Sequence, residues 1–413
     1  MKKYALIGEK LSHSYSKDIH SFFGLSYTLE EVKKENLERF VKDSDYSGFN
    51  VTIPYKSAVM PFLDFISDEA KAIGAVNTIV KQNGRLLGYN TDVDGMRDAI
   101  NLSGVSLKDK TVAILGSGGA SKAALYLSKT MGAKKIIIVS RSGDVNYTNI
   151  YNKEHTDNIE VIINTTPLGM YPNVSACPLD ITAFKKLILV FDAVYNPLNT
   201  IFRLSAKERS ILAPSGLYML VSQAVKAESI WGENAYMPDS VNKAFQEIYL
   251  KKCNIVLEGM PGSGKTTIGR LLAKSLSKTF VDTDEEFEKI TGVHPSAFIK
   301  EKGEEAFRAI ESDVVRSVSK ESSKVIALGG GAVLRKENRS FLKQNGIVVY
   351  IKRPLNALSL ENRPLTAMHG IERLYAERSS IYEEFKAFSV ENCTSLDEVV
   401  SEIQKNLLTF IDK

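Results

Sequence analysis

The sequence predicts an α/β protein with at least two nucleotide-binding domains, because two glycine-rich turns each lie between a buried strand and a helix. The first turn spans residues 116–121 (GSGGAS) and follows the apolar run 111–115. The second spans 259–267 (GMPGSGKTT) and follows the apolar run 254–257. Strands that are apolar throughout, alternating with amphipathic helices, are typical of parallel sheets covered by helices. The chain on either side of the second turn is long enough for a domain, so we expect two enzyme-sized units joined near residues 249–252.

The composition is ordinary for a soluble globular protein and excludes several other classes. Of the 413 residues, 44% are hydrophobic and 25% are charged. A net charge of +4 is too small to indicate a nucleic-acid or membrane partner. Cys177, Cys253 and Cys393 are scattered without metal-ligand spacing, which favours a reducing cytoplasm. The first apolar run is too short for a signal peptide, and no run is long enough to span a membrane.

The second turn has the complete pattern of a phosphate-binding P-loop. Glycines, including Gly262 and Gly264, let backbone N–H groups point at a phosphate, and the helix that follows adds its positive dipole end. Lys265 reaches the outer phosphates, and the hydroxyl of Thr266 can hold Mg²⁺, with Thr267 next to it. The sequence therefore predicts an ATP-type site here.

Two carboxylates end the next predicted strand, 279–284. Asp282 and Asp284 can simply cap the following helix, but beside a P-loop one can hold Mg²⁺ and the other can accept a hydroxyl proton. The strand at 325–328 lacks a terminal acid, so we assign the metal to Asp282 together with Thr266. No guanine-recognition pattern follows, which argues against a GTPase.

The first turn predicts a dinucleotide site formed by Gly116, Gly118, Gly119 and Ala120, although serine occupies the third glycine position. The next strand, 135–139, ends in Ser140-Arg141-Ser142. An acid at this position would bind the ribose of NAD, whereas Arg141 and its hydroxyl neighbours suit the 2′-phosphate of NADP. Asp144 keeps NAD open as an alternative.

Polar residues mark the ends of short strands in the first hundred residues. They occur in the segments 11–16 (LSHSYS), 48–56 (GFNVTIPYK), 74–78 (GAVNT) and 88–92 (GYNTD). Each has an ordinary explanation when taken alone: the serines and Asp92 can cap helices, and Lys56 can be solvated.

Taken together, these segments resemble the substrate-binding domain of shikimate dehydrogenase in order and spacing. The resemblance implies that Ser14 and Ser16 hold the substrate carboxylate and that Lys56 and Asp92 form the catalytic pair. It also implies that the ring hydroxyls are held by Thr52, Asn77, Asp92 and Gln223. Near the substrate it places Tyr195 and Gln223, and near NADP(H) it places Thr165 and Met219. The chemistry is consistent, because hydride reduction of a ketone creates an alkoxide that a lysine ammonium can protonate.

The segment from residue 251 to the end resembles shikimate kinase over nearly its whole length. The P-loop, the Asp282–Asp284 pair, residues 303–311 (GEEAFRAIE), the glycines 329–331, Arg363-Pro-Leu365, and Arg378 with Tyr382 carry this resemblance. It implies that Asp284, Arg308, Gly330 and Arg378 bind shikimate, that Asp284 is the base, and that Lys265 and Arg363 stabilise the moving phosphoryl group. An arginine that the family often places upstream of Arg363 is absent, and the lid after Arg363 is short.

We therefore expect a bifunctional enzyme of the shikimate pathway. Its predicted domains are a substrate-binding domain (1–100, with return helices at 224–250), a Rossmann-like NADP domain (101–223) and a P-loop kinase domain (251–413) with a parallel sheet flanked by helices. The expected ligands are 3-dehydroshikimate, shikimate, NADP(H), ATP and Mg²⁺, with no nucleic-acid or membrane partner.

Two alternatives remain open. The kinase half can be a nucleotide sensor without turnover, which the short lid and the absent arginine would explain. The first half can instead use quinate and NAD, with Asp144 taking over from Arg141. A purely structural role is disfavoured because so many polar residues lie at strand ends in the order of a binding site.

Overall fold

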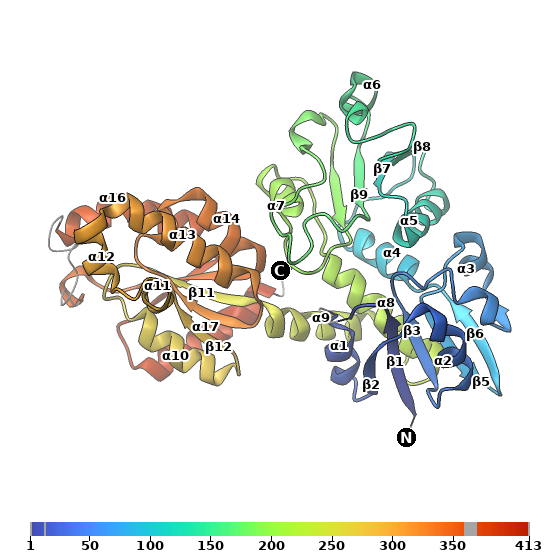
Figure 1. The fold of residues 1–413 in the computed structure, drawn as a ribbon. Helices are drawn as coiled ribbons and strands as arrows, with labels where there is room; N and C mark the ends of the chain where they lie inside the picture. Colours follow the sequence, from blue (N-terminus) through green and yellow to red (C-terminus); the bar gives the residue numbers. More distant parts are fainter. Residues whose placement is uncertain (1, 12–13, 359–369, 412–413) are drawn as a thin grey trace. The chain divides into compact units, whose positions relative to one another are not determined.

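The computed structural model describes residues 2–11, 14–358 and 370–411, and the chain forms two compact units, Met1–Ile248 and Tyr249–Lys413 (Figure 1). The division lies at the predicted junction, and residues 249–252 are the end of helix α9 (Pro238–Lys252). In the described part of the chain, no helix is both long and apolar enough to cross a membrane.

The first unit begins with a six-stranded mixed sheet in the order β2-β1-β3-β5-β6-β4. Its strands are β1 (Lys3–Gly8), β2 (Ser26–Glu31), β3 (Gly48–Val51), β4 (Phe65–Ile66), β5 (Thr78–Gln82) and β6 (Arg85–Tyr89). The accompanying helices are α1 (Ser16–Phe22), α2 (Leu37–Asp43), α3 (Asp68–Ile73) and α4 (Asp92–Leu102). Strand β1 is parallel to β2 and β3, whereas β5 is antiparallel to β3 and β6. The segments that carry Lys56 and Asn77 meet at Asp92, the first residue of α4.

A late helix, α8 (Gly216–Trp231), completes the core of this first sheet. Trp231 stacks on Tyr4 with ring centroids 4.4 Å apart, and its indole N–H donates to the carbonyl of Ile79 over 2.9 Å. Helix α8 also packs closely against α4, where a Cβ on Gly95 would lie 2.5 Å from the carbonyl oxygen of Met219. The predicted domain boundary between residues 223 and 224 therefore falls inside one continuous helix.

The second sheet of this unit has four parallel strands in the order β10-β9-β7-β8. The strands are β7 (Thr111–Leu115), β8 (Lys135–Val139), β9 (Val161–Asn164) and β10 (Leu189–Asp192), with helices α5 (Gly119–Thr130), α6 (Lys153–Thr156) and α7 (Ile201–Glu208). The chain crosses from β7 to β8 on one side and reaches β9 on the other. Ligands of open α/β sheets bind at such a switch point, and the first glycine turn lies there.

The second unit is a five-stranded parallel sheet in the order β12-β13-β11-β14-β15. Its strands are β11 (Asn254–Glu258), β12 (Thr279–Asp282), β13 (Lys324–Ala327), β14 (Gly346–Lys352) and β15 (Phe388–Glu391). The helices are α10 (Lys265–Ser275), α11 (Thr283–Thr291), α12 (Pro295–Lys302), α13 (Glu304–Lys320), α14 (Lys336–Asn345), α16 (Ile371–Phe385) and α17 (Leu396–Ile411). Helices α10 and α17 cover one face of the sheet, and α13 and α14 cover the other (Figure 1).

Strand β11 is buried along its whole length, as expected for the central strand of a parallel sheet. Strand β12 ends at Asp282, so Asp284 lies in the first turn of α11 instead of on the strand. A capping box opens the last helix, because the backbone N–H of Ser395 donates to Glu398 over 3.1 Å and its hydroxyl accepts from the N–H of Glu398.

Candidate active sites

A buried cluster in the first unit joins Lys56, Asp92 and Asn77. The Nζ of Lys56 donates to Oδ2 of Asp92 over 2.6 Å, and Nδ2 of Asn77 donates to Oδ1 over 2.9 Å. The side chains of Lys56 and Asp92 are 18% and 9% exposed, so the ion pair is largely shielded from water. Asp92 is the first residue of α4 and Thr91 is its N-cap, so the capping role considered for Asp92 is not the one observed. The carboxylate instead bonds to the lysine and the amide, at the positive end of the helix dipole.

Gln223 reaches the same cluster from α8. Its Oε1 accepts from Nδ2 of Asn77 at 3.4 Å and from the hydroxyl of Thr91 at 3.3 Å. Thr91 is fully buried and was not predicted as a site residue. Its only sequence signal was its position inside the 88–92 segment, directly before Asp92.

The two predicted carboxylate-binding serines lie together at the start of α1. Their hydroxyls are 3.2 Å apart, and the Ser14 hydroxyl also hydrogen-bonds to Tyr195. Burial raises the pKa of Tyr195, and the bond to Ser14 partly offsets this. Thr52 follows β3, and its backbone N–H donates to the carbonyl of Ile7 over 2.9 Å. The chain thus groups Ser14, Ser16 and Tyr195 as one set of hydroxyls.

The first glycine turn lies directly beside the Lys56 side chain. A Cβ on Gly119 would be 3.6 Å from Cδ of Lys56, whereas one on Gly118 would meet no atom within 4 Å. Gly116 has a φ of +110° and approaches the hydroxyl of Thr165, which would lie 2.8 Å from a Cβ there. Open space at the N-terminus of α5, where Ala120 also lies, fits a pyrophosphate.

Ser121 has a structural reason to replace the third glycine of this turn. Its hydroxyl donates to the carbonyl of Gly116 over 2.7 Å and so closes the turn. The departure from the simple glycine fingerprint therefore leaves the turn intact.

Met219, predicted near the cofactor, is buried in α8.

Arg141 and Asp144 are both exposed after β8. The backbone N–H of Ser140 donates to the carbonyl of Val145 over 3.1 Å, and the carbonyl of Asp144 accepts from Asn149 over 2.8 Å. Burial raises the pKa of Tyr147, and the charge of Arg141 counteracts this, which places the guanidinium near that ring. The geometry leaves Arg141 accessible to a phosphate.

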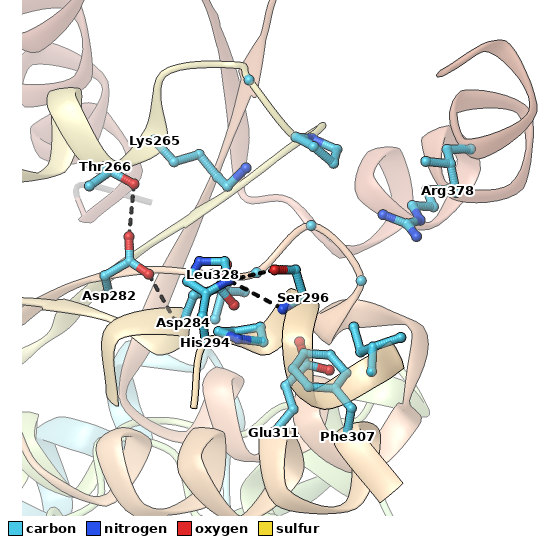
Figure 2. A pocket seen from close by; sticks show the side chains of 18 of the residues that line it. Lys265, Thr266, Asp282, Asp284, His294, Ser296, Phe307, Glu311, Leu328 and Arg378 are labelled. Carbon is cyan, nitrogen blue, oxygen red and sulfur yellow. Dashed lines mark hydrogen bonds between the residues drawn. The ribbon is translucent and has the colours of Figure 1, made fainter. Parts of the chain in front are cut away.

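The second unit contains a cavity of about 550 Å³ at the carboxyl ends of its strands (Figure 2). Its lining includes predicted site residues from five segments of the chain: Gly262, Gly264, Lys265, Thr266, Thr267, Asp282, Asp284, Arg308, Gly330 and Arg378. Arg363 lies outside the described residues.

The P-loop adopts the backbone that its glycines permit. Gly262 and Gly264 have φ values of +85° and +96°, which residues with side chains rarely adopt. The Nζ of Lys265 donates to the carbonyls of Gly259 and Met260 at 2.9 and 3.0 Å. Lysine is thereby held over the loop, where a phosphate can replace these carbonyls as its partner.

Two neighbouring oxygens offer a site for a hard cation. The hydroxyl of Thr266 donates to Oδ2 of Asp282 over 2.8 Å, while Oδ1 of Asp282 accepts from the N–H of Asp284 (Figure 2). Asp282 therefore caps α11 and contacts the P-loop at the same time. Within the described residues no cluster of three or more His, Cys, Asp or Glu could hold a metal. Magnesium that keeps several waters and binds phosphate needs no such cluster.

Asp284 lies beside this pair and faces the cavity. Burial raises its pKa, the negative charge of Asp282 adds to this, and Lys265 opposes it. A carboxylate whose pKa moves towards neutrality is a stronger base than an ordinary aspartate.

Two arginines of the cavity can bind an anionic group. Nη1 of Arg308 donates to Oε2 of Glu311 over 2.7 Å, and Nη2 donates to Glu304 over 2.9 Å. Burial raises the pKa of Glu311 to about 7 although Arg308 opposes this. Nε of Arg378 is buried without a hydrogen-bond partner among the described residues. Both guanidinium groups line the cavity, and their forked N–H donors suit a ligand carboxylate.

The glycine triplet 329–331 leaves no room for side chains. A Cβ on Gly331 would lie 2.6 Å from Nη1 of Arg308, and one on Gly329 would lie 2.8 Å from Oδ1 of Asp284. The hydroxyl of Tyr382 fixes the loop by donating to the carbonyl of Gly330. The triplet therefore lets two predicted substrate-binding side chains approach the backbone.

Comparison with known proteins gives one result for each unit. A family model of the shikimate dehydrogenase substrate binding domain matches residues 6–79, and one of shikimate kinase matches residues 261–408. The shikimate dehydrogenase (NADP(+)) of Clostridium beijerinckii is 42% identical over 250 residues, which are 56% of this chain and 93% of that protein.

Solved structures agree with the first of these results. A chorismate mutase/shikimate 5-dehydrogenase fusion protein from Clostridium acetobutylicum is 38% identical, with a TM-score of 0.57 over 60% of this chain and 97% of that one. Shikimate 5-dehydrogenase from Thermus thermophilus, in complex with NADP(H) and shikimate, is 30% identical, with a TM-score of 0.54 over 60% of this chain and all (100%) of that one.

Proposed function

Because the chain belongs to the shikimate dehydrogenase family over its first unit and carries a shikimate kinase domain in its second, we propose that it performs two consecutive reactions. The first unit reduces 3-dehydroshikimate to shikimate with NADPH, and the second phosphorylates shikimate to shikimate 3-phosphate with ATP. The observation that supports this proposal is that a titratable side chain lies beside each glycine-rich turn: Lys56 beside Gly119, and Asp284 in the same cavity as the P-loop. The scattered free cysteines and the mild net charge support a cytoplasmic enzyme with small-molecule substrates and no nucleic-acid or membrane partner.

In the proposed dehydrogenase reaction, NADPH supplies the hydride when bound. Ser14, Ser16 and Tyr195 hold the substrate carboxylate, while Thr52, Asn77, Asp92 and Gln223 hold the ring hydroxyls. Lys56 donates a proton to the alkoxide oxygen and recovers it in the reverse reaction. Asp92 orients the lysine ammonium, because it accepts from Nζ at 2.6 Å. Gly116, Gly118, Gly119 and Ala120 bind the pyrophosphate, Ser140 and Arg141 bind the 2′-phosphate, and Thr165 and Met219 flank the cofactor.

In the proposed kinase reaction, Asp284 accepts the proton of the attacking hydroxyl. Arg308 and Arg378 hold the substrate carboxylate beside Gly330, and Lys265 stabilises negative charge on the transferred phosphoryl group, as Arg363 is also proposed to do. Gly262, Gly264, Thr266 and Thr267 bind the phosphates of ATP. Mg²⁺ fits the oxygens of Thr266 and Asp282, and when bound it neutralises phosphate charge.

We expect the full-length chain to release ADP from Mg²⁺-ATP only when shikimate is present. Replacing Lys265 with alanine should lower kcat at least about 100-fold, because it removes a preorganised charge from the transition state. Lys274→Ala, at an exposed lysine of α10, is the matched control and should keep full activity. ATP binding without shikimate-dependent turnover in the wild type would instead show that this unit is a nucleotide sensor.

We expect Arg141→Gln to raise the KM for NADP⁺ about 10- to 100-fold, because a charge-assisted contact with the 2′-phosphate is lost. The KM for NAD⁺ should change little, which makes NAD⁺ the internal control in a shikimate oxidation assay. Equal losses with both cofactors would contradict the 2′-phosphate contact. A wild type that prefers NAD⁺ and quinate would support the other assignment, through Asp144.

A further inference from the structure

A buried polar cluster that the proposed chemistry does not use lies next to the dehydrogenase site. It consists of His20 on α1, Tyr27 on β2, Asn50 on β3 and Glu228 on α8. His20 and Glu228 are 0% exposed, and Tyr27 and Asn50 are each 4% exposed. Burying a titratable pair this completely costs free energy unless hydrogen bonds compensate, so the contacts of the cluster indicate what it does.

The orientation of the Asn50 amide follows from its neighbours. Its Nδ2 faces the backbone carbonyl of Asn77 at 3.5 Å and the hydroxyl of Thr78 at 3.3 Å. A carbonyl can only accept, so the amide nitrogen must lie on this side. The oxygen of Asn50 therefore faces His20 and Tyr27, and both of them must donate to it.

This orientation makes Nε2 of His20 a donor. Nε2 donates to Oδ1 of Asn50 over 3.1 Å, and Nδ1 meets Oε1 of Glu228 at 2.6 Å. The second oxygen of Glu228 accepts from Nδ2 of Asn234 over 2.9 Å. Glu228 is therefore held at both oxygens, and it fixes the ring of His20 in a dry interior.

The direction of donation continues from Asn50 into the catalytic cluster. The Thr78 hydroxyl accepts from Asn50, and it donates to Oδ1 of Asn77 over 3.1 Å. The same oxygen accepts from the backbone N–H of Thr91 over 2.7 Å. With its oxygen fixed on this side, Asn77 must point Nδ2 at Asp92, which in turn holds Lys56.

We propose that His20, Glu228, Asn50 and Thr78 are positioning residues for the dehydrogenase reaction. Together with the backbone N–H of Thr91, they form a hydrogen-bond relay that holds the Asn77 amide in this orientation and so aligns Asp92 and Lys56 with the substrate. If the Asn77 amide were reversed, its oxygen would face the carboxylate of Asp92 and repel it. The inference rests on the proposed dehydrogenase function.

The sharpest test compares two substitutions of Thr78, whose side chain is fully buried. Valine keeps the shape and removes the hydroxyl, whereas serine keeps the hydroxyl and removes a methyl group. The relay predicts that Thr78→Val lowers kcat for shikimate oxidation about 10- to 100-fold, with a smaller change in KM, because catalytic groups lose alignment. Thr78→Ser should stay within a few-fold of wild type, and kinase turnover of both variants should be unchanged.

A role in packing alone predicts the opposite order, with Thr78→Ser impaired and Thr78→Val nearly normal, and that result would overturn the proposal. Thr156→Val, at a buried threonine of α6, is the matched control for replacing a buried hydroxyl. Thermal unfolding of each variant checks that it is folded at the assay temperature.

A second measurement reads the protonation of His20 directly. Nitrogen-15 NMR of the histidine rings in the wild-type chain, with His20 assigned from a His20→Gln spectrum, should show Nε2 of His20 protonated. An unprotonated Nε2 would contradict the direction of the relay even if the Thr78 variants unfold. A wild type without dehydrogenase turnover would refute the proposed function, whereas normal turnover with an unprotonated Nε2 would refute only the relay.

Discussion

Replacing Lys56 with methionine is expected to lower the kcat of shikimate oxidation by about 10²- to 10⁴-fold, the usual contribution of a positioned general acid–base group. Methionine keeps most of the length and the apolar stem but has no proton to exchange. The variant leaves the buried carboxylate of Asp92 without its cationic partner, so binding should also weaken. The measurement is initial-rate NADP⁺ reduction over a range of shikimate concentrations.

The matched control is Lys71→Met in the same unit. Lys71 also faces an aspartate, Asp68, at 3.5 Å, but both side chains are exposed. Its loss should leave kcat unchanged, since exposed pairs contribute little. Kinase turnover should be normal in both variants. If Lys56→Met retained a kcat within about tenfold of wild type, the proton would have to come from another group.

The second large effect concerns Glu258, the last residue of β11. It is 1% exposed, and neither carboxylate oxygen has a hydrogen-bond partner among the described residues. Burial raises its pKa from an ordinary 4.5 to about 9, although the charge of Lys265 opposes this. At neutral pH the folded chain therefore carries a protonated acid where the unfolded chain carries a carboxylate.

The pH dependence follows from this difference. Between pH values of about 4.5 and 9 the folded state binds one proton more than the unfolded state, so stability falls as pH rises across this range. At pH 7 the cost is about 3 kcal/mol by linkage. Glu258→Met should raise the free energy of unfolding of the second unit by about this amount at pH 7, by more at pH 9, and by little at pH 5.

The test is urea unfolding of the full-length chain at pH 5, 7 and 9. Hydrogen exchange of the β11 backbone shows which unfolding transition belongs to the second unit. Glu391→Gln is the matched control, because Glu391 ends β15 of the same sheet but is exposed. A Glu258→Met variant with unchanged or lower stability at pH 9 would mean that the carboxylate has a partner when ionised.

Local patterns predicted the nucleotide turns well because their cause is local. A turn with positive φ at Gly262 and Gly264 demands glycine, and the adjoining strand and helix are encoded in consecutive residues. Local patterns could not show whether Asp92 caps its helix or forms an ion pair. Its partner Lys56 is 36 residues away in sequence, and only the resemblance to a family joined the two.

Other features depend on packing that a single sequence does not display. Glu258 reads as the polar end of a strand, but β14 continues alongside it and pairs Tyr350 with it, which buries the carboxylate. In the sequence, Asn50 and Thr78 look like ordinary polar residues of strands, so nothing there indicates the relay.

The contribution of Trp231 to the first sheet also sets an order for folding during synthesis. The aromatic stack on Tyr4 needs Trp231, which is synthesised about 140 residues after β6, the last strand of that sheet, ends at Tyr89. At translation rates of about 5–20 residues per second, the sheet waits roughly 7 to 28 s for the helix that covers it. The four-stranded sheet β10-β9-β7-β8 comes from one continuous stretch of the sequence and can fold in that interval. A nascent chain stalled before residue 216 should therefore bind dinucleotide analogues and remain open to chaperones at its N-terminal sheet.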